Sequence, residues 1–260
     1  MNLTGNTILI TGGSSGIGLE LIRQLVPKKN KIIITGRNPS KLDKVRKEFP
    51  QVEVIASDVC NAQEIKNLHE KITRDFPDLN ILINNAGIMR TINVHEKQND
   101  LEELTREIET NLNGPIRMVQ QFLPGLKMQK SAAIVNVTSG LAFVPLPTCP
   151  VYCSTKAGLH SYTLSLRTQL KKTNVQVFEL APPATQTELL GEFDPHDMKG
   201  ISIMKVQDMV AAAIKGMEAN QFEIRPGQSN QLKFMSRLAP QFILDQLSKP
   251  VDRMLQNRRN

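Results

Sequence analysis

Aromatic residues, cysteines and long apolar runs are scarce in this chain of 260 residues. The chain contains no tryptophan, two tyrosines and three cysteines. Three cysteines form no even disulfide framework, and they fit a reducing compartment. No apolar run approaches the roughly 18 residues of a membrane span. The first residues also lack the basic segment of a signal peptide. We therefore expect a cytoplasmic protein.

Metal and nucleic-acid sites are not indicated either. The histidines are scattered, and Cys149 and Cys153 have no nearby Cys or His to complete a metal set, so we expect buried thiols and no metal. The net charge is +7, but the basic residues are spread along the chain without a recognition motif. We predict no nucleic-acid partner, because a basic balance also suits an enzyme that binds a phosphate-rich cofactor.

The apolar fraction of 40% is ordinary for a soluble globular protein. Apolar runs alternate with segments of helical spacing, and no linker-like stretch separates them. We predict a single-domain, doubly wound α/β Rossmann fold over residues 1–228, with about seven parallel strands and helices on both faces. The predicted strands are 7–10, 31–35, 52–57, 81–83, 132–138, 175–180 and 222–225.

A serine, a tyrosine and a lysine in the middle of the chain suggest carbonyl chemistry. Ser139 precedes Tyr152 by thirteen residues, and Lys156 follows Tyr152 by four. On a helix, Tyr152 and Lys156 would share a face, where the ammonium would lower the pKa of the phenol. Ser139 could then hold a carbonyl oxygen against the Tyr152 hydroxyl for proton transfer. Alone, this spacing equally fits a helix face with a solvated lysine.

Residues 11–18, T-G-G-S-S-G-I-G, follow a short apolar run and precede a segment with helical spacing. A strand, a glycine turn and a helix in this order allow a pyrophosphate to bind at the helix N-terminus. The glycine spacing is G-x-x-x-G-x-G rather than G-x-G-x-x-G. We favour a cofactor site over a purely structural turn, because the turn lies between strand and helix at the start of the chain.

Charged residues follow the second and third predicted strands. Arg37 comes directly after the strand at 31–35, with no carboxylate before Asp43. An arginine here accommodates a ribose 2′-phosphate, whereas NAD sites use an acidic residue, so we predict NADP(H) over NAD(H). The alternative is a solvated turn arginine. Asp58 is placed to accept a hydrogen bond from adenine or to cap the next helix, and Asn61 can take the capping role.

Two further polar motifs are candidates for the same site. Residues 84–87, N-N-A-G, follow the fourth predicted strand and could brace the first strand or form an ordinary turn. Asn111 lies within a long helical pattern over 101–128, where asparagine is unfavourable by propensity. Gly114 and Pro115 predict a kink nearby. A local cost of this kind often marks a functional position.

Together these motifs resemble those of the short-chain dehydrogenase/reductase family, in its branch of roughly 250 residues. The resemblance covers about residues 3–225. The matching residues, in order and spacing, are Thr11, Gly12, Gly16, Ile17, Gly18, the segment 84–87, Asn111, Ser139, Tyr152 and Lys156. The run P-P-A-x-Q-T-E-L-L and the tail are similar to the DltE-type subgroup of bacterial oxidoreductases. Pro182-Pro183 replaces the usual Pro-Gly, which could stiffen this loop and alter the substrate pocket.

The resemblance implies a role for each matching residue. Tyr152 would be the general acid/base, Lys156 would lower its pKa and hold the nicotinamide ribose, and Ser139 would orient the substrate. Asn111 would hold a water of the proton relay. The implied cofactor-binding residues are Gly12, Ser14, Ser15, Gly16, Ile17, Gly18, Arg37, Asp58, Val59, Asn85, Ala86, Gly87, Tyr152, Lys156, Pro182, Thr185 and Thr187.

We therefore expect an NADP(H)-dependent oxidoreductase that interconverts a small carbonyl compound and its alcohol by hydride transfer. The scarcity of aromatics and of charged clamps favours a modest apolar substrate. The competing hypothesis is a non-enzymatic NADP(H)-sensing regulatory protein, and an intact Asn-Ser-Tyr-Lys set argues against it. A homodimer or homotetramer is expected from the resemblance only.

Two segments are open to more than one interpretation. Residues 191–205 are polar and turn-rich, then apolar, which favours a substrate lid over a plain surface excursion. The basic tail, residues 229–260, carries apolar residues at helix-like spacing, broken by Pro240. We expect this tail to pack on the body or on a second subunit, and peripheral membrane contact is the weaker alternative.

Overall fold

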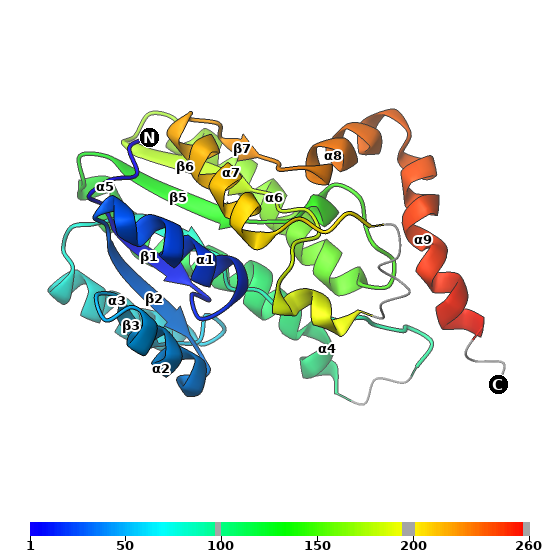
Figure 1. Cartoon of the computed structure of the whole chain (residues 1–260), viewed down its shortest axis with the longest axis horizontal. Coiled ribbons are helices and arrows are strands. Elements are labelled where there is room, and N and C mark those ends of the chain that lie inside the picture. The colour runs from blue at the N-terminus through cyan, green and yellow to red at the C-terminus, as the bar shows by residue number, and fades with distance from the viewer. Residues whose placement is uncertain (97–99, 194–200, 257–260) are drawn as a thin grey trace.

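The computed structural model describes residues 1–96, 100–193 and 201–256. Within them, seven strands form one parallel sheet in the order β3-β2-β1-β4-β5-β6-β7, which confirms the predicted doubly wound fold (Figure 1). The strands are β1 (Thr7–Thr11), β2 (Lys31–Gly36), β3 (Glu53–Ala56), β4 (Leu79–Asn84), β5 (Ala132–Val137), β6 (Val175–Leu180) and β7 (Glu223–Ile224). The helices are α1 (Gly16–Leu25), α2 (Pro39–Glu48), α3 (Ala62–Asp75), α4 (Leu101–Ile108), α5 (Gly114–Met128), α6 (Pro150–Leu170), α7 (Val206–Glu218), α8 (Gln228–Leu238) and α9 (Pro240–Gln256).

Both faces of the sheet are buried under helices. In β1, Ile8 and Ile10 pack in one core cluster with residues of α1, α2 and α7. Leu9 faces the other side and packs in a second cluster with residues of α3, α5 and α6. A parallel strand that is buried on both faces needs a continuous apolar run, which is why the central strands show no polar alternation.

The strand order places the loops that carry the predicted site along one edge of the sheet. All strands run in the same direction, so the segments that follow β1 to β6 leave at their shared carboxyl edge (Figure 1). Strands β2 and β3 lie on one side of β1, and β4 to β7 lie on the other side, so the strand order reverses between β1 and β4. Ligands of open α/β sheets bind at such a topological switch point.

The observed elements depart from the prediction in a few places. The helical pattern over 101–128 contains one π-helical turn, Glu109–Asn113, just before the kink expected at Gly114 and Pro115. The seventh strand has two residues instead of the predicted four. The tail forms two helices that meet at Ala239, directly before Pro240. Of the lid predicted over 191–205, residues 194–200 lie outside the described residues.

None of the described helices is both long and apolar enough to cross a membrane.

Candidate active site

Tyr152 lies in the first turn of α6, which begins at Pro150. Proline suits the start of a helix, because its missing N–H would have no partner there. The side chain is enclosed by apolar neighbours, and Tyr152 is only 5% exposed. It packs in a small cluster with the buried residues Met89, Cys149 and Cys153. The phenol is therefore shielded from water at the carboxyl edge of the sheet.

Lys156 lies one turn further along α6, on the same face as Tyr152, as the spacing predicted. Its Nζ atom is 5.7 Å from the centroid of the Tyr152 ring. The ammonium group is buried, and it donates a hydrogen bond of 2.9 Å to the carbonyl oxygen of Val137. Burial lowers the pKa of Lys156 to about 8. This lysine is therefore not the solvated surface residue of the alternative interpretation.

Ser139 follows β5 and begins the short 3₁₀ helix Gly140–Ala142. Its Oγ atom accepts a hydrogen bond of 3.1 Å from the Leu141 amide, which leaves the hydroxyl proton free to donate. Burial raises the pKa of Tyr152 above its usual range, and the hydrogen bond with Ser139 opposes that rise. The net direction is opposite to the one expected from Lys156 alone, because the loss of water around the phenolate is the larger effect.

Asn111 lies in the π-helical turn between α4 and α5, and it is fully buried. Its Oδ1 atom accepts from the Ile88 amide at 2.9 Å, and its Nδ2 atom donates to the Ile88 carbonyl at 2.8 Å. A second Nδ2 hydrogen bond, of 3.2 Å, reaches Thr155 Oγ1 in α6. A π-helical turn often marks a functional site. Here it turns the amide towards both the β4 loop and the helix that carries Tyr152.

Gly87 shows how closely Asn111 and Lys156 approach each other. A Cβ atom at Gly87 would lie 3.3 Å from Asn111 Oδ1 and 3.5 Å from Lys156 Nζ. Both polar groups thus converge on the backbone of the same residue, and a side chain there would crowd them. The structure therefore brings the four predicted catalytic residues together in one group, which we call the catalytic group: Asn111, Ser139, Tyr152 and Lys156.

The N-terminus of α1 is suited to an anion. Its N-cap residue, Ser15, makes no side-chain capping hydrogen bond, and the first turn contains no acidic residue. The free N–H groups and the positive end of the helix dipole favour a negative charge. Gly12 and Gly16 have φ values of +65° and +52°, a left-handed conformation that favours glycine. This turn fits the pyrophosphate of a dinucleotide.

Two further residues of the glycine turn, Ser14 and Ile17, have different surroundings. Ser14 lies beside the end of β2, where its Oγ atom would be 3.3 Å from a Cβ on Gly36. Ile17 is partly buried and packs against the first core cluster. Ser14 is therefore close to the segment that carries Arg37, whereas the Ile17 side chain is part of the core.

Asn85 and Ala86 brace the end of β1, as one interpretation of the N-N-A-G motif expected. Their backbone amides both donate to Thr11 Oγ1 at 3.0 Å. The Asn85 side chain donates to the carbonyl oxygens of Thr11 and Gly12, also at 3.0 Å. These bonds hold the loop after β4 against the glycine turn, so the motif does more than reverse the chain direction.

Arg37 and Asp58 lie next to each other beyond β2 and β3. The shortest distance between the guanidinium and the carboxylate is 3.6 Å, and the Arg37 side chain is 38% exposed. Asn61 caps α3 by accepting hydrogen bonds from Gln63 and Glu64, which leaves Asp58 free of that role. Like Ile17, Val59 packs its side chain in a core cluster, so only its backbone can reach a ligand.

The loop after β6 connects the glycine turn with the catalytic group. The Pro182 carbonyl accepts a 2.8 Å hydrogen bond from the Gly140 amide, beside Ser139. Thr185 is buried and donates to the Pro183 carbonyl at 2.8 Å. At the other end, Thr187 lies 3.3 Å from the position of a Cβ on Gly16. Half-buried Leu189, Leu190 and Phe193 then pack on the Tyr152 cluster.

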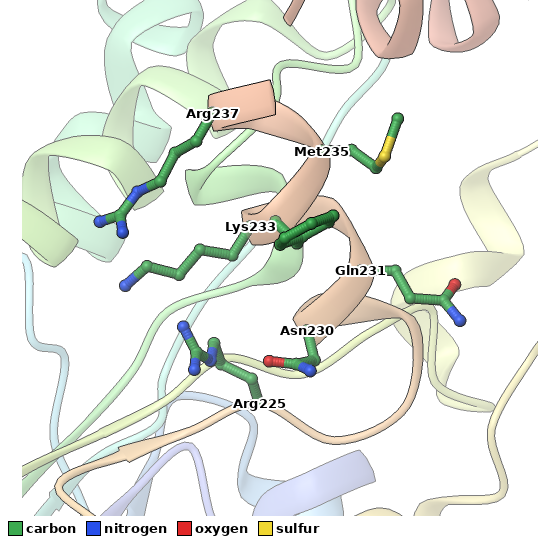
Figure 2. A pocket seen from close by; sticks show the side chains of 7 residues that line it. Arg225, Asn230, Gln231, Lys233, Met235 and Arg237 are labelled. Atoms are coloured by element: carbon green, nitrogen blue, oxygen red, sulfur yellow. The ribbon is translucent and has the colours of Figure 1, made fainter. Parts of the chain in front are cut away.

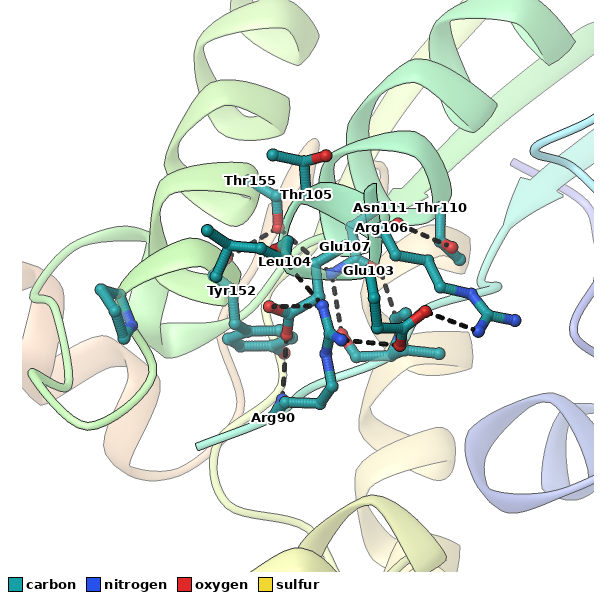
Figure 3. Close-up of polar contacts among 12 residues, drawn as sticks. Arg90, Glu103, Leu104, Thr105, Arg106, Glu107, Thr110, Asn111, Tyr152 and Thr155 are labelled. Atoms are coloured by element: carbon teal, nitrogen blue, oxygen red, sulfur yellow. Dashed lines mark hydrogen bonds and ion pairs between the residues drawn. The ribbon is translucent and has the colours of Figure 1, made fainter. Parts of the chain in front are cut away.

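Glu107 is a buried residue that the sequence patterns did not single out (Figure 3). Its side chain is fully buried one helical turn before Asn111, and its Oε1 atom accepts a 2.9 Å hydrogen bond from the Arg90 amide. Its Oε2 atom has no hydrogen-bond partner. Burial raises the pKa of Glu107, although Arg90 opposes that rise, and the carboxylate in turn raises the pKa of Tyr152. Its position four residues before Asn111 was the only sequence signal.

Known proteins of similar sequence and structure point to one family. The sequence model described as "short chain dehydrogenase" matches residues 6–197. The uncharacterized oxidoreductase DltE of Bacillus subtilis is 38% identical over 250 residues, which cover 95% of this chain and 98% of DltE. The uncharacterized oxidoreductase SA2266 of Staphylococcus aureus is 30% identical over 229 residues, which cover 86% of this chain and 98% of SA2266.

A solved structure agrees with the sequence relatives. A short chain dehydrogenase from Burkholderia cenocepacia, in complex with NADP, superposes with a TM-score of 0.82 at 26% identity, over 95% of this chain and 99% of that one. A 3-ketoacyl-(acyl-carrier-protein) reductase from Brucella melitensis, complexed with NADH, gives 0.75 at 27% identity, over 83% and 91%. The chain is thus an oxidoreductase that belongs to the short-chain dehydrogenase family.

Proposed function

We propose that this protein is an NADP(H)-dependent reductase of small apolar carbonyl compounds, with Tyr152 as the proton donor. One observation carries the proposal. The buried Tyr152 is grouped with Ser139, Lys156 and Asn111 at the edge of the sheet where the uncapped N-terminus of α1 is exposed to a ligand. A phenol that is protected from water beside an anion site suits proton transfer to a substrate held against a dinucleotide.

The residues at this edge fit a phosphorylated dinucleotide. The glycine turn and the N-terminus of α1 would take the pyrophosphate, and the half-exposed Arg37 guanidinium would take a 2′-phosphate. No acidic residue directly follows β2, where an NAD site would use one. The bound nicotinamide would supply the hydride for the carbonyl carbon. The NADP complex of the Burkholderia cenocepacia relative supports this choice.

The protein's own side chains would handle the proton. The raised pKa keeps Tyr152 protonated at neutral pH, so the phenol can donate to a carbonyl oxygen as it becomes an alkoxide. The Ser139 hydroxyl, which hydrogen-bonds with Tyr152 and accepts from the Leu141 amide, would orient the same oxygen by donating its proton to it. Lys156 donates one N–H to the Val137 carbonyl oxygen, so its two other N–H groups are available to ribose hydroxyls or to the new phenolate. Both Asn111 amide protons are already donated, so a relay water would have to donate to its Oδ1 atom.

The surroundings of Tyr152 favour an apolar substrate. Met89, Cys149 and Cys153 are buried beside the phenol, and Leu141, Leu146, Leu189, Leu190 and Phe193 pack on this cluster while remaining partly accessible. An apolar lining with a few convergent polar groups is typical of a small-molecule site. A charged group on the substrate would lose its hydration here without gaining a partner.

NADPH consumption against a panel of aldehydes, ketones and diketones tests this function, with Tyr152→Phe assayed beside the wild type. We expect turnover by the wild type and a loss of at least about 100-fold in the variant, because that is the usual contribution of a positioned acid. Near-normal turnover by Tyr152→Phe would contradict the assignment. Tight NADPH binding without turnover of any carbonyl would instead favour the cofactor-sensing alternative. Cytoplasmic location and a homo-oligomeric state remain predictions.

A further inference from the structure

A cavity lies beside α8 (Figure 2). Its volume is about 630 Å³, within the range of small-molecule sites. It is lined by Arg225, which follows β7, and by six residues of α8: Asn230, Gln231, Lys233, Phe234, Met235 and Arg237. None of the residues assigned above to catalysis or cofactor binding lines it. The cavity is therefore separate from the proposed catalytic and cofactor sites.

The cavity carries an excess of positive charge. Figure 2 shows the side chains of Lys233 and Arg237 leaving α8 on one side, with Arg225 close to Lys233. Within the described part of the chain, the one carboxylate paired with these cations is Glu223, which contacts Lys233 and lies 3.1 Å from Arg225. Burial opposes ionisation of Glu223, but the hydrogen bond and charge of Lys233, followed by Arg225, hold its pKa below the usual range. The three cations Arg225, Lys233 and Arg237 are thus balanced by one carboxylate only, that of Glu223.

Several hydrogen-bond donors of the cavity are unused. The Nε atom of Arg225 is buried and has no hydrogen-bond partner. Arg237 forms no ion pair within residues 1–96, 100–193 and 201–256. A buried guanidinium N–H without a partner is costly, and a ligand oxygen would relieve that cost. The unused donors and the charge both favour an anion.

These donors are held on a fixed support. Lys233 is buried, and its Nζ atom lies 5.0 Å from the centroid of the Phe143 ring. Ser229, at the start of α8, packs closely on Gly140. A Cβ atom added to Gly140 would lie only 2.7 Å from Ser229 Oγ. The helix is therefore anchored to the body, and the cations need little reorganisation to bind a ligand.

The rest of the lining is apolar or neutral. Phe234 is 63% exposed although it is a large apolar side chain, and Met235 lies near it along the helix. An inorganic anion would leave these surfaces in contact with water, whereas an anion with an apolar part would cover them. We propose that the cavity beside α8 binds a small amphiphilic anion, a carboxylate or phosphate that carries an alkyl or aryl group.

Isothermal titration calorimetry of the full-length protein with octyl phosphate tests the proposal, below the concentration at which octyl phosphate forms micelles. Nonanoate is the matching carboxylate probe. We expect saturable binding of at least one of them. Arg237→Gln should weaken that binding at least about tenfold, as expected when one charge-assisted hydrogen bond is lost. Arg237 is exposed and has no ion-pair partner among the residues that the structure describes, so this variant should fold normally.

Two controls separate this cavity from general charge effects and from the cofactor site. Lys215→Gln removes one exposed positive charge from α7 and should leave the affinity unchanged. Saturating NADP+ should not displace the probe, because the cavity shares no residue with the proposed cofactor site. Phe234→Ser should bring the affinity for octyl phosphate down towards that for inorganic phosphate.

Four results would overturn the proposal. These are no binding of either probe, equal affinity in the wild type and Arg237→Gln, displacement of the probe by NADP+, and equal affinity for octyl phosphate and inorganic phosphate. Because the readout is binding and needs no turnover, the proposal can fail while the reductase function holds, and the reverse is also true.

Discussion

Two sets of charged and polar side chains lie along the carboxyl edge of the sheet, and they differ in burial. In the catalytic group, Tyr152 and Lys156 are almost completely buried. At the edge of β2 and β3, Arg37 is 38% exposed and lies 3.6 Å from Asp58. Burial shifts the pKa of Tyr152 upward and that of Lys156 downward, so both shifts favour the neutral form.

The difference in burial indicates a division of labour. Burial of the phenol and the amine costs stability, because the charged form of each group is poorly solvated. The exposed arginine costs little stability, since water screens its charge. We therefore expect changes in the catalytic group to alter the chemical step and its pH dependence. Changes at Arg37 should alter the binding of the cofactor.

Lys156→Met should have the largest effect on activity. Loss of the ammonium removes the hydrogen-bond donors beside Tyr152 while keeping a flexible side chain of similar length. We expect kcat/KM for carbonyl reduction to fall at least about 100-fold. Steady-state kinetics at pH 7 measure the loss, and Lys172→Met, in the exposed turn just after α6, is the matched control.

The same variant tests the cost of burial. The pKa of Lys156 falls from 10.5 to about 8 on folding, so the unfolded chain binds more protons between these pH values and stability rises with pH across that window. The cost, at most about 3 kcal/mol, is fully present below pH 8. Lys156→Met has no buried amine and therefore lacks this cost. The stability of the variant relative to wild type should therefore decrease from pH 7 to pH 10, as measured by urea unfolding, and a constant difference would contradict the burial argument.

Arg37→Ala should weaken NADPH binding about 10- to 100-fold, the effect of losing charge-assisted hydrogen bonds to a phosphate. NADH lacks the 2′-phosphate, so its affinity should change much less. Fluorescence titration with each cofactor measures both effects. Arg46→Ala, on the exposed face of nearby α2, is the control for general loss of positive charge. Equal losses for NADPH and NADH would show that Arg37 is only a solvated turn residue.

Glu107→Gln should have the smallest effect, a shift in pH dependence. The Glu107 carboxylate raises the pKa of Tyr152, so a neutral amide should lower it. For alcohol oxidation, where Tyr152 must accept a proton, the rising limb of the pH–rate profile should move down by about one unit or less. Glu103→Gln is the matched control, since Glu103 also pairs with Arg90 but is half exposed. Identical pH–rate profiles for Glu107→Gln and wild type would show that Glu107 does not influence the pKa of Tyr152.

The fold and the clustering of Asn111, Ser139, Tyr152 and Lys156 could be predicted from local patterns and from the family resemblance, whereas the catalytic roles of these residues stay predictions. Apolar runs typical of a buried parallel sheet, alternating with helical segments, predicted a doubly wound fold of about seven strands, and the structure shows seven within the described residues. The spacing of Tyr152 and Lys156 is fixed by the helix, and Ser139 is fixed by the end of β5. Asn111 was recognised from its poor helix propensity, although the sequence indicated a kink and not a π-helical turn.

Features that depend on three-dimensional packing could not be predicted. The pKa of Tyr152 was expected to fall beside Lys156, but burial raises it and outweighs the hydrogen bond with Ser139. The family resemblance placed Val59 at the cofactor site but did not indicate that its side chain packs in the core, which leaves only the backbone for a ligand. Glu107 resembled an ordinary helix carboxylate, and only the packing of α4 shows it to be buried. The cavity beside α8 needs Arg225 and α8 to meet, and their spacing in the sequence does not indicate this.

The most direct test of the division of labour is to measure NADPH affinity and turnover on the same preparations of Tyr152→Phe and Arg37→Ala. We predict that Tyr152→Phe binds NADPH like the wild type and loses at least about 100-fold in turnover. Arg37→Ala should bind NADPH about 10- to 100-fold more weakly and retain most of its turnover at saturating cofactor. If both variants lost binding and turnover in parallel, the buried and exposed sets would not have separate roles, and the account would be contradicted.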